Sequence, residues 1–472
     1  MAEEIKTTVA EHADFDTERE NQFKILNKLL ENRQMRSLQL ILEDMNEFDV
    51  AEFLSEVDEK RRPMVFRMLS KETAADVFAN FDVDDQETII NSITDSELSV
   101  IMEELFVDDV VDMMGELPAN VVKRVMRAAK PDHRRLINQY LNYPDDSAGS
   151  IMTAEFVDLK KYMNVKESIA RIRKIGEDKE TIYICYVTTS DRKLEGVVTV
   201  KDLLLHDDDM IIEEIMDTNV IYANTTDDQE EVTEKISDYD LLAIPVVDRE
   251  RRLVGIITVD DVIDVMEEEA TEDFEKMAAM TPSDKPYSKT PVIEIWKNRI
   301  PWLMFLMISA TFTSMIINNF EASLAAQAVL VSFIPMLMGT GGNSGAQAST
   351  AVIRSISLGD VEPKDVLSVL WKEWRVALLA GVSLASVNFV KMLLVDQMLL
   401  HNSEVTLIVA ATVSASIVFI VMFAKVVGSS LPILAEKIGV DPAVMANPLI
   451  STITDAVSLI IYFAIARVLL HI

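Results

Sequence analysis

The sequence is poor in cysteine and histidine. Its 472 residues include one cysteine and five histidines. A single cysteine, Cys185, cannot form an internal disulfide, which fits a reducing compartment, and its apolar neighbours indicate a core position. The histidines are scattered and none forms a His-x-x-x-His pair, so the sequence offers no zinc site.

Positive charge is also scarce, and the charge is unevenly spread. The chain has 44 Lys and Arg against 78 Asp and Glu, a net charge of −34. Ten acidic and eight basic residues lie from Ile300 onward, which leaves −32 on the first 299 residues. An acidic part of this kind does not suit nucleic acid or an anionic membrane surface as a partner. It suits a part of the protein that meets cations.

Residues 1–142 are expected to form an all-α domain. Apolar residues recur at helical spacing, and Thr94 to Glu97 has the spacing of a capping box. Loosely repeated motifs that begin at Asp49 and Thr73 predict short helices stacked as a small superhelix. This shape favours an interaction or regulatory role, because no catalytic constellation accompanies it.

Residues 150–208 and 210–266 form an internal repeat. Each copy has a strand, a turn, a second strand and a Thr-x-x-Asp motif, and the matching Gly196 and Gly255 are 59 residues apart. The repeat resembles a pair of CBS domains, an α/β fold that often binds adenosyl nucleotides. Asp202 matches the position that takes ribose hydroxyls in that fold, which makes ATP a candidate cofactor. A helix N-cap is the alternative interpretation of Asp202.

Residues 262–285 are expected to form a long, acidic connecting helix and a linker. Acidic side chains recur along it at i, i+3 and i+4, and like charges at that spacing destabilise a helix. A bound divalent cation would reverse the sign of this interaction. We therefore interpret the acidic cluster as a cation-sensing latch, with a solvated linker helix as the alternative.

Five apolar runs of spanning length follow, in a transmembrane domain at 296–472. They lie near 300–318, 323–355, 376–395, 405–427 and 446–470. Basic residues between the spans, such as Lys425 and Lys437 between the fourth and the fifth, place the N-terminal half in the cytoplasm and the C-terminus outside. Lys391, near the end of the third span, is the one basic residue on the wrong side.

The last span carries a polar stripe. An Asp at mid-bilayer costs at least about 2.5 kcal/mol, so Asp455 is expected to face a partner or a water-filled path. Eight residues of ideal helix advance about 800°, so Asn447 and Asp455 flank one broad face. Ser451 falls between them and Thr452 lies at the edge. The stripe predicts a path lined by oxygen ligands; helix-to-helix hydrogen bonds are the alternative.

Four glycines interrupt the second span. Gly339-x-Gly-Gly-x-x-Gly345 has the look of a phosphate loop, but no Lys-Ser/Thr follows and the flanks are apolar. Small residues allow helices to approach closely, or they mark a broken helix that lines a cavity. Asn343 is the best candidate ion ligand of the group, with Gly342 and Gly345 beside the pore.

Taken together, these features closely resemble the MgtE family of magnesium channels over nearly the whole chain. The specific motifs are Gly-Thr-Gly-Gly-Asn-Ser-Gly and Asn-Pro-…-Thr-x-x-Asp. The resemblance implies a homodimer in the lipid bilayer of the inner (plasma) membrane, with a pore on the two-fold axis. It implies Mg²⁺ influx that stops when cytosolic Mg²⁺ is high. Asp455 matches the family's selectivity aspartate, and Asn447 matches its cytosolic pore asparagine.

The resemblance also implies a set of regulatory Mg²⁺ ligands. They match Asp240, Asp261, Asp264, Glu269, Glu272, Asp273 and Asp441, and Asp108 and Asp109 fall in an acidic turn that should face the CBS pair. Ions that bridge these carboxylates would close the pore. Two other classes stay open: a carrier of divalent cations coupled to H⁺ or Na⁺, and a membrane receptor. An enzyme is the least favoured class.

Overall fold

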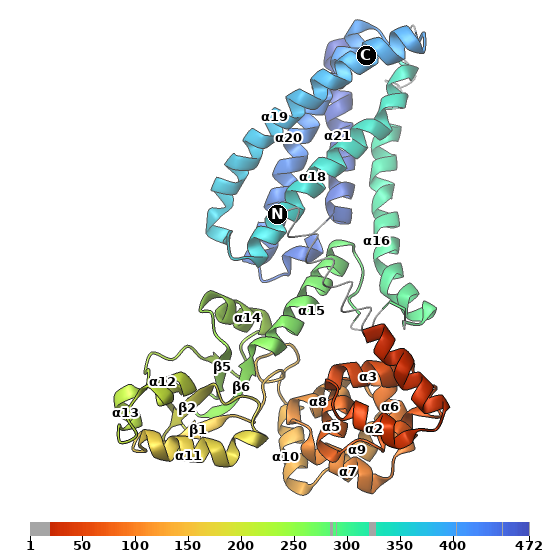
Figure 1. The fold of residues 1–472 in the computed structure, drawn as a ribbon. Coiled ribbons are helices and arrows are strands. Elements are labelled where there is room, and N and C mark those ends of the chain that lie inside the picture. Colours follow the sequence, from red (N-terminus) through yellow and green to blue (C-terminus); the bar gives the residue numbers. More distant parts are fainter. Residues whose placement is uncertain are drawn as a thin grey trace. The chain divides into compact units, whose positions relative to one another are not determined.

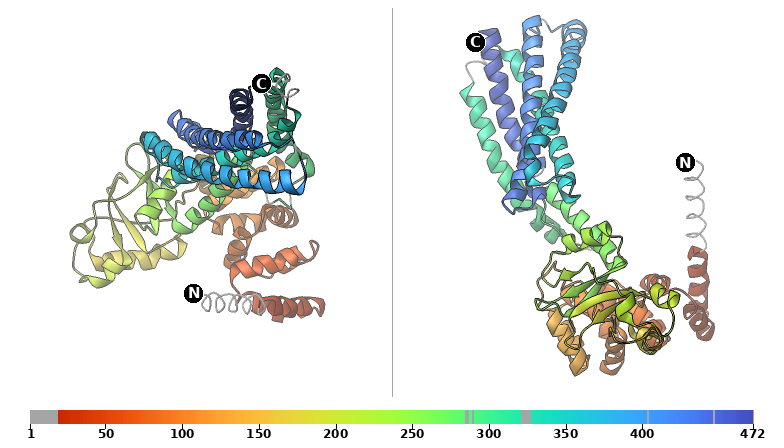
Figure 2. Two further views of the ribbon diagram at one scale, coloured as in Figure 1. Left: turned by 90° about the horizontal axis from the view of Figure 1, so that it is seen from above. Right: turned by 90° about the vertical axis from the view of Figure 1, so that its left-hand side faces the viewer.

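The computed structural model describes residues 19–283, 287–288, 290–320, 327–402, 404–445 and 447–471. They fall into two compact parts, one up to Met266 and one from Glu267 onward. Figure 1 shows the elements and Figure 2 gives two further views.

The first part begins with short helices. Residues 19–31 are helical. The next helices are α2 (Met35–Leu42), α3 (Glu47–Glu56), α4 (Arg62–Phe66), α5 (Lys71–Ala79), α6 (Val83–Ser92), α7 (Asp95–Glu104), α8 (Val107–Glu116), α9 (Ala119–Ala128) and α10 (Pro131–Tyr140). A new helix starts about every 12 residues, and the side chains of Asn46, Ser70, Asp82 and Thr94 cap the first turns of α3, α5, α6 and α7. The capping box predicted at Thr94 and Glu97 is confirmed at the start of α7.

Two three-stranded sheets follow, and they share one topology. The first contains β1 (Val157–Leu159), β2 (Ile184–Thr188) and β3 (Leu194–Thr199), and the second contains β4 (Ala223–Asn224), β5 (Ala243–Val247) and β6 (Leu253–Thr258). In each sheet the first strand pairs in parallel with the second, and the second pairs antiparallel with the third. The repeat predicted from sequence is therefore a repeat of structure.

Helices surround these sheets and lead out of them. They are α11 (Val165–Ile175), the 3₁₀ turn η1 (Gly176–Asp178), α12 (Val200–Leu205), α13 (Ile212–Ile215), α14 (Gln229–Asp238) and the long helix α15 (Val259–Met277). Cys185 lies in β2 with no exposed surface, as predicted. Burial raises the pKa of its thiol to about 12. The long connecting helix predicted after the second copy is α15.

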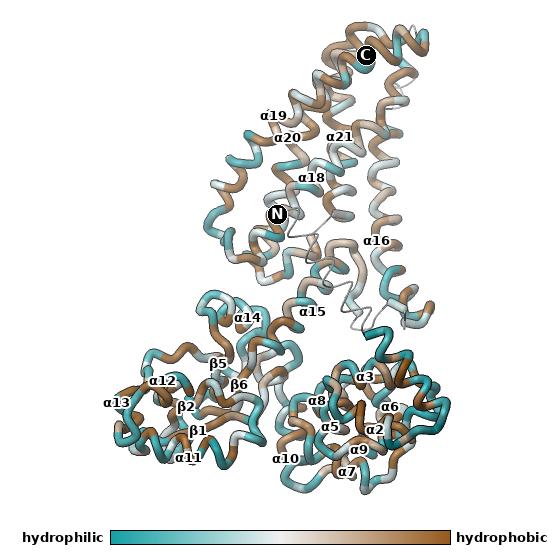
Figure 3. The backbone as a smooth tube through the Cα atoms, in the orientation of Figure 1, coloured by the Kyte–Doolittle hydropathy of each residue, from teal (hydrophilic) through white to brown (hydrophobic). Residues whose placement is uncertain are grey.

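The second part contains long helices. They are α16 (Val292–Asn319), α18 (Ile334–Ser357), α19 (Val366–Lys391), α20 (Leu407–Lys437) and α21 (Asn447–Leu470), with short turns η2 (Ala328–Phe333), η3 (Pro363–Asp365) and η5 (Pro442–Met445) and a π-helix, η4 (Met392–Leu399). Figure 3 shows the apolar character of these helices. Helix α18 packs against both α20 and α21, and α16 contacts α21 at the edge of the bundle (Figures 1 and 2).

Four described helical segments are long and apolar enough to cross a membrane. They are Val292–Asn319, Pro363–Leu399, Leu407–Lys437 and Pro442–Leu470. Helix α18 is not among them, although the sequence predicts a span there, because its Gly, Ser, Thr, Asn and Gln residues make it less apolar. The predicted span 323–355 also includes residues 323–326, which lie outside the described residues.

The prediction that Lys425 lies between the fourth and fifth spans is wrong, because Lys425 lies within α20. Lys437 is the last residue of that helix. The Lys425 side chain is only 8% exposed, and its Nζ lies 3.5 Å from Glu373 Oε2 of α19. The carboxylate of Glu373 compensates the positive charge of Lys425. The helix can therefore continue past Lys425, where the sequence predicted the end of the span.

Candidate functional site

Helix α21 positions the predicted polar stripe. It begins at Asn447, whose side chain lies outside the described residues. The Thr452 hydroxyl donates a 3.0 Å hydrogen bond to the Pro448 carbonyl one turn earlier in the helix. Ser451, Thr452 and Asp455 are all half-buried. The carboxylate of Asp455 is therefore neither sealed in the bundle nor fully exposed.

The glycines of α18 provide close contacts with neighbouring helices. A Cβ on Gly342 would lie 3.4 Å from Ser451 Oγ, and one on Gly345 would lie 2.7 Å from Ile450. Helix α18 runs without a break through this segment, so neither a phosphate loop nor a broken helix forms there. Asn343 is exposed on the same helix. The small residues let α18 approach the polar stripe of α21.

Carboxylates also gather inside the first part, where α8 lies near the sheets. Asp108 and Asp109 occupy the first turn of α8. Desolvation by burial, together with repulsion from Asp109, Asp261, Glu155 and Glu180, raises the pKa of Asp108 to about 9. One oxygen of Asp108, Oδ1, is buried and has no hydrogen-bond partner. Its environment disfavours an uncompensated negative charge.

Asp109 and Glu180, in the same acidic cluster, show the same effect. Desolvation, with repulsion from Asp261 and Glu155, raises the pKa of Asp109 to about 6, although its side chain is exposed at one edge. Desolvation and repulsion from Asp261 also raise the pKa of Glu180 to about 7. Sequence reasoning placed Asp108 and Asp109 opposite the CBS pair, and the structure brings them together with Asp261. It missed Glu155 and Glu180, since both lie in connecting segments that carry no motif.

The two Thr-x-x-Asp motifs have equivalent local structures. The Asp202 carboxylate accepts hydrogen bonds from the Thr199 N–H at 3.0 Å and from its hydroxyl at 2.5 Å. The Asp261 carboxylate accepts the same pair from Thr258, at 3.3 and 2.5 Å. Asp202 therefore occupies the third helical position of a capping box whose N-cap is Thr199, and is not itself the N-cap. Asp261 differs from Asp202 because other carboxylates surround it.

A second acidic group lies at the end of α15. Lys276 Nζ is 2.5 Å from Glu272 Oε1 and 2.7 Å from Asp441 Oδ2. Burial lowers the pKa of Lys276, but the hydrogen bonds that its ammonium donates to Asp441 and Glu272 outweigh burial and raise that pKa above its ordinary value. Burial and the charge of Asp441 raise the pKa of Asp273. An ammonium thus lies among three carboxylates predicted as Mg²⁺ ligands.

Of the remaining predicted ligands, Asp264 lies near the first acidic cluster, where burial and the charges of Asp260 and Asp264 raise the pKa of Asp261. Asp240 and Asp264 are exposed, and Asp240 has a positive φ of 50°. Glu269 is half-buried on α15. Across the described residues, no three Asp, Glu, His or Cys side chains converge closely enough to hold a metal ion. The acidic groups are concentrations of charge, and a bound ion would need water or further protein groups to complete its coordination.

Comparison with known proteins decides the family. The model of a family described as a divalent cation transporter, MgtE, matches residues 334–465, and the model of the MgtE intracellular N domain matches residues 45–146. The magnesium transporter MgtE of Thermus thermophilus is 37% identical over 450 residues, which cover 94% of this chain and 98% of the relative. The chain belongs to the MgtE family.

Other members of the MgtE family and a solved structure agree with this assignment. The magnesium transporter MgtE of Bacillus subtilis is 30% identical and covers 94% of this chain and 96% of its own. A crystal structure of the soluble part of a magnesium transporter superposes with a TM-score of 0.51 at 32% identity, over 53% of this chain and 99% of that one. These MgtE relatives are named as transporters, which points away from an enzyme.

The CBS family model matches residues 212–268, the second copy of the repeat. The shared strand register identifies the first copy as the same fold.

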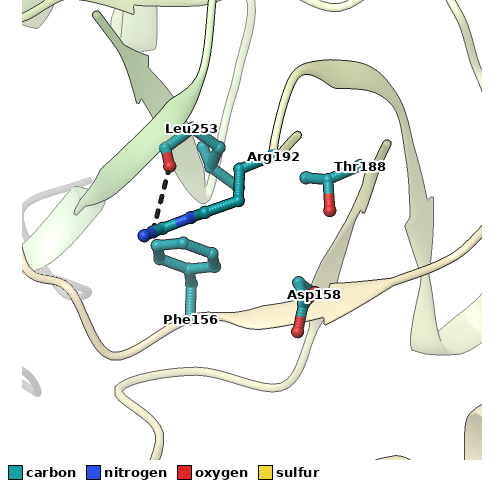
Figure 4. Close-up of a pocket in the computed structure, with 5 residues that line it drawn as sticks. All are labelled: Phe156, Asp158, Thr188, Arg192 and Leu253. Atoms are coloured by element: carbon teal, nitrogen blue, oxygen red, sulfur yellow. Dashed lines mark hydrogen bonds between the residues drawn. The ribbon is translucent and has the colours of Figure 1, made fainter. Parts of the chain in front are cut away.

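A cavity lies near the turns of the two β-hairpins. Its volume is about 240 Å³, and it is lined by Phe156, Asp158, Thr188, Arg192 and Leu253 (Figure 4). Arg192 donates a 3.2 Å hydrogen bond to the Leu253 carbonyl there. Asp202 does not line this cavity, so the cavity does not supply the nucleotide site predicted at Asp202.

Proposed function

We propose that the chain is an Mg²⁺-selective channel that mediates Mg²⁺ influx and closes when cytosolic Mg²⁺ is high. It acts as a homodimer in the plasma membrane. Five helices of each copy span the bilayer, the four apolar segments and α18, with the N-terminal half cytoplasmic and the C-terminus outside. The proposal rests on membership of the MgtE family and on the electrostatics of the acidic groups.

The acidic cluster of Asp108, Asp109, Glu155, Glu180 and Asp261 carries the proposal. Their mutual repulsion and partial desolvation raise the pKa values of three of them well above the ordinary range. The Tyr140 hydroxyl and one oxygen of Asp108 are buried without hydrogen-bond partners. Such a cluster is stable as carboxylates only beside a cation. Mg²⁺ suits it because Mg²⁺ keeps several waters and needs only one or two carboxylates.

In the pore, Asp455 is the proposed selectivity residue. Two Asp455 side chains, related by the two-fold axis of a dimer, would hold one hydrated divalent ion and be neutralised by it. Asn447, Ser451, Thr452 and Asn343 provide the other oxygen ligands of the path. Gly342 and Gly345 allow α18 and α21 to lie close enough to shape it.

Regulation follows from charge. At low Mg²⁺ the carboxylates repel one another, and at high Mg²⁺ the ions bridge them and favour the closed arrangement. The ion must then bind the closed state more tightly than the open one. The proposed ligands are Asp240, Asp261, Asp264, Glu269, Glu272, Asp273, Asp441, Asp108 and Asp109. Helix α15 transmits the change, because it connects the acidic cluster to the group around Asp441.

The proposed domains have separate roles. Residues 1–142 form the helical regulatory domain, residues 150–266 the CBS pair, residues 262–285 the connecting helix and linker, and residues 296–472 the pore. ATP binding at the first CBS copy, through Asp202, is part of the proposal. Its support is the match of Asp202 to the ribose-binding position, and its capping hydrogen bonds leave the second carboxylate oxygen for a ligand.

The test is Mg²⁺ influx into proteoliposomes under a membrane potential, with no pH or Na⁺ gradient. The natural chain is compared with Asp455→Asn, which removes the charge and keeps the shape. Asp360→Asn, in a loop of the same part, is the matched control. Flux in the natural chain and the control, lost or made unselective in Asp455→Asn, supports the channel. Flux that starts only with an imposed pH or Na⁺ gradient would instead favour a coupled carrier, with Asp455 as its proton site.

A further inference from the structure

Lys391 is the basic residue that the charge pattern of the spans does not explain. It is the last residue of α19, 17 residues after Trp374, so it lies roughly 25 Å along the helix from that residue. Trp374 stacks on Trp371 at 5.3 Å beside Lys372 and Arg375, an arrangement typical of a membrane interface. Lys391 therefore lies at the opposite interface of the bilayer.

A change of helix type gives Lys391 a partner. The chain continues from α19 into the π-helix η4, and Lys391 Nζ lies 2.9 Å from Asp396 Oδ2. In an α-helix, residues five apart point about 140° away from each other. The wider π turn brings them onto one face, and such turns occur frequently at functional sites. The ion pair is thus built by the local backbone.

The two partners of the ion pair differ in exposure. The Asp396 side chain is 15% exposed, whereas Lys391 is 45% exposed. Asp396 Oδ2 is shielded from solvent and lies in contact with Lys391 Nζ. A carboxylate carries about four lone-pair sites, so Asp396 can accept a further N–H beside this ion pair.

A cavity lined by both polar and apolar side chains opens beside the pair. Its volume is about 450 Å³, and it is lined by Ser332, Phe333, Met336, Lys391, Asp396, Asn402 and Val405. Exposed apolar side chains flank it along η4. They are Leu394, Met398 and Leu399, which are 55, 66 and 70% exposed. A charged pocket therefore lies at the membrane interface, next to an exposed apolar surface.

We propose that this pocket binds the headgroup of a zwitterionic phospholipid that carries a primary ammonium, such as phosphatidylethanolamine. The lipid phosphate pairs with Lys391, and the lipid ammonium donates a hydrogen bond to the Asp396 carboxylate. The acyl chains lie on the apolar side chains of η4. A choline headgroup has no N–H to donate, and a purely anionic headgroup meets the charge of Asp396. The inference does not depend on which ion the protein transports.

The test measures which lipids the purified full chain retains. The protein is exchanged into bilayer discs that contain equal amounts of phosphatidylethanolamine, phosphatidylcholine and phosphatidylglycerol, and the retained lipid is quantified by native mass spectrometry. A hydrogen bond to a charged group predicts about a tenfold preference for phosphatidylethanolamine over phosphatidylcholine. Asp396→Asn should abolish this preference and favour phosphatidylglycerol, because Lys391 is then unpaired. Lys364→Met, at the other end of the same span, is the control.

Several outcomes would overturn the proposal. One is equal retention of the three lipids by the natural chain, a comparison that needs no variant to fold. Another is an unchanged preference in a folded Asp396→Asn protein. Displacement of the lipid by Mg²⁺ would make the pocket a cation site. Complete displacement by soluble phosphoethanolamine would show that the acyl chains contribute nothing and that the ligand is not a lipid.

Discussion

Substitution of Gly428 by alanine tests the close packing on which the proposed pore depends. Helices α18 and α20 approach so closely that a Cβ on Gly428 would lie 2.2 Å from the Gly345 carbonyl oxygen and 3.0 Å from its Cα. Both atoms belong to the backbone of a helix, so no side chain can rotate away. The helices must separate to accept a single methyl group.

The size of the effect follows from two opposing contributions. Alanine is favoured over glycine in a helix by up to about 1 kcal/mol. Overpacking costs about 1–3 kcal/mol where side chains can adjust, and more where they cannot. We expect Gly428→Ala to lower the free energy of unfolding by about 2 kcal/mol or more. Gly339→Ala is the matched control, since a Cβ there would have nothing within 4 Å.

The assay is thermal unfolding of the full chain in detergent, alongside Mg²⁺ flux in proteoliposomes. Gly428→Ala should lower the Tm by roughly 4–8 °C, by the scaling for a part of about 200 residues. Gly339→Ala should leave the Tm unchanged or raise it slightly. If the two variants unfold at the same temperature, helices α18 and α20 do not pack as described, and the packing argument for the pore fails.

Three further predictions concern charged groups outside the apolar helical segments. In metal-free buffer, the raised pKa values of Asp108 and Asp109, about 9 and 6, mean that the acidic cluster holds together best below the ordinary carboxylate pKa and loosens as pH rises through 6 to 9. Proteolysis of residues 143–150, which connect the helical domain to the first CBS copy, should accelerate over that range, and a flat profile would contradict this. Lys276→Met removes two ion pairs. The interaction between α15 and Asp441 should therefore weaken by about 1 kcal/mol, and amide hydrogen exchange in α15 should increase. Arg62→Met removes the guanidinium that donates to the largely buried Asp85 carboxylate and to three backbone carbonyl groups. It should destabilise the helical domain by about 3–5 kcal/mol in thermal unfolding, whereas an unchanged Tm would show that the arginine is not buried.

Local sequence predicted most of the elements. Thr94 and Glu97 mark a helix start because both hydrogen bonds of a capping box join residues three apart. Gly196 and Gly255 mark equivalent strands because the β-hairpin that contains each is formed by neighbouring segments. Interactions of this short range are encoded where they occur, so one sequence suffices to find them.

Features that depend on contacts between distant parts of the chain could not be predicted from the sequence. Hydropathy ended the fourth span near Lys425, because a lysine lowers the average and its partner Glu373 lies 52 positions earlier. Glu155 and Glu180 were missed for the same reason, since only the tertiary fold brings them near Asp261. The gathering of like charges has no periodic signal, because each charge comes from a different element.

The acidic residues are best understood by what could neutralise them. At Asp441 the chain supplies its own cation, Lys276, and the ion pairs are short. Among the described hydrogen bonds and ion pairs, no lysine or arginine neutralises the carboxylates around Asp108. The pKa values of Asp108 and Asp109 are raised as a result. A chain with a net charge of −34 has no shortage of exposed positions for acids. Gathering several partly buried carboxylates without a counter-charge therefore costs free energy that a structural role does not require. An external cation recovers that free energy only when the cluster is assembled, and this difference is what lets cation concentration control the assembly.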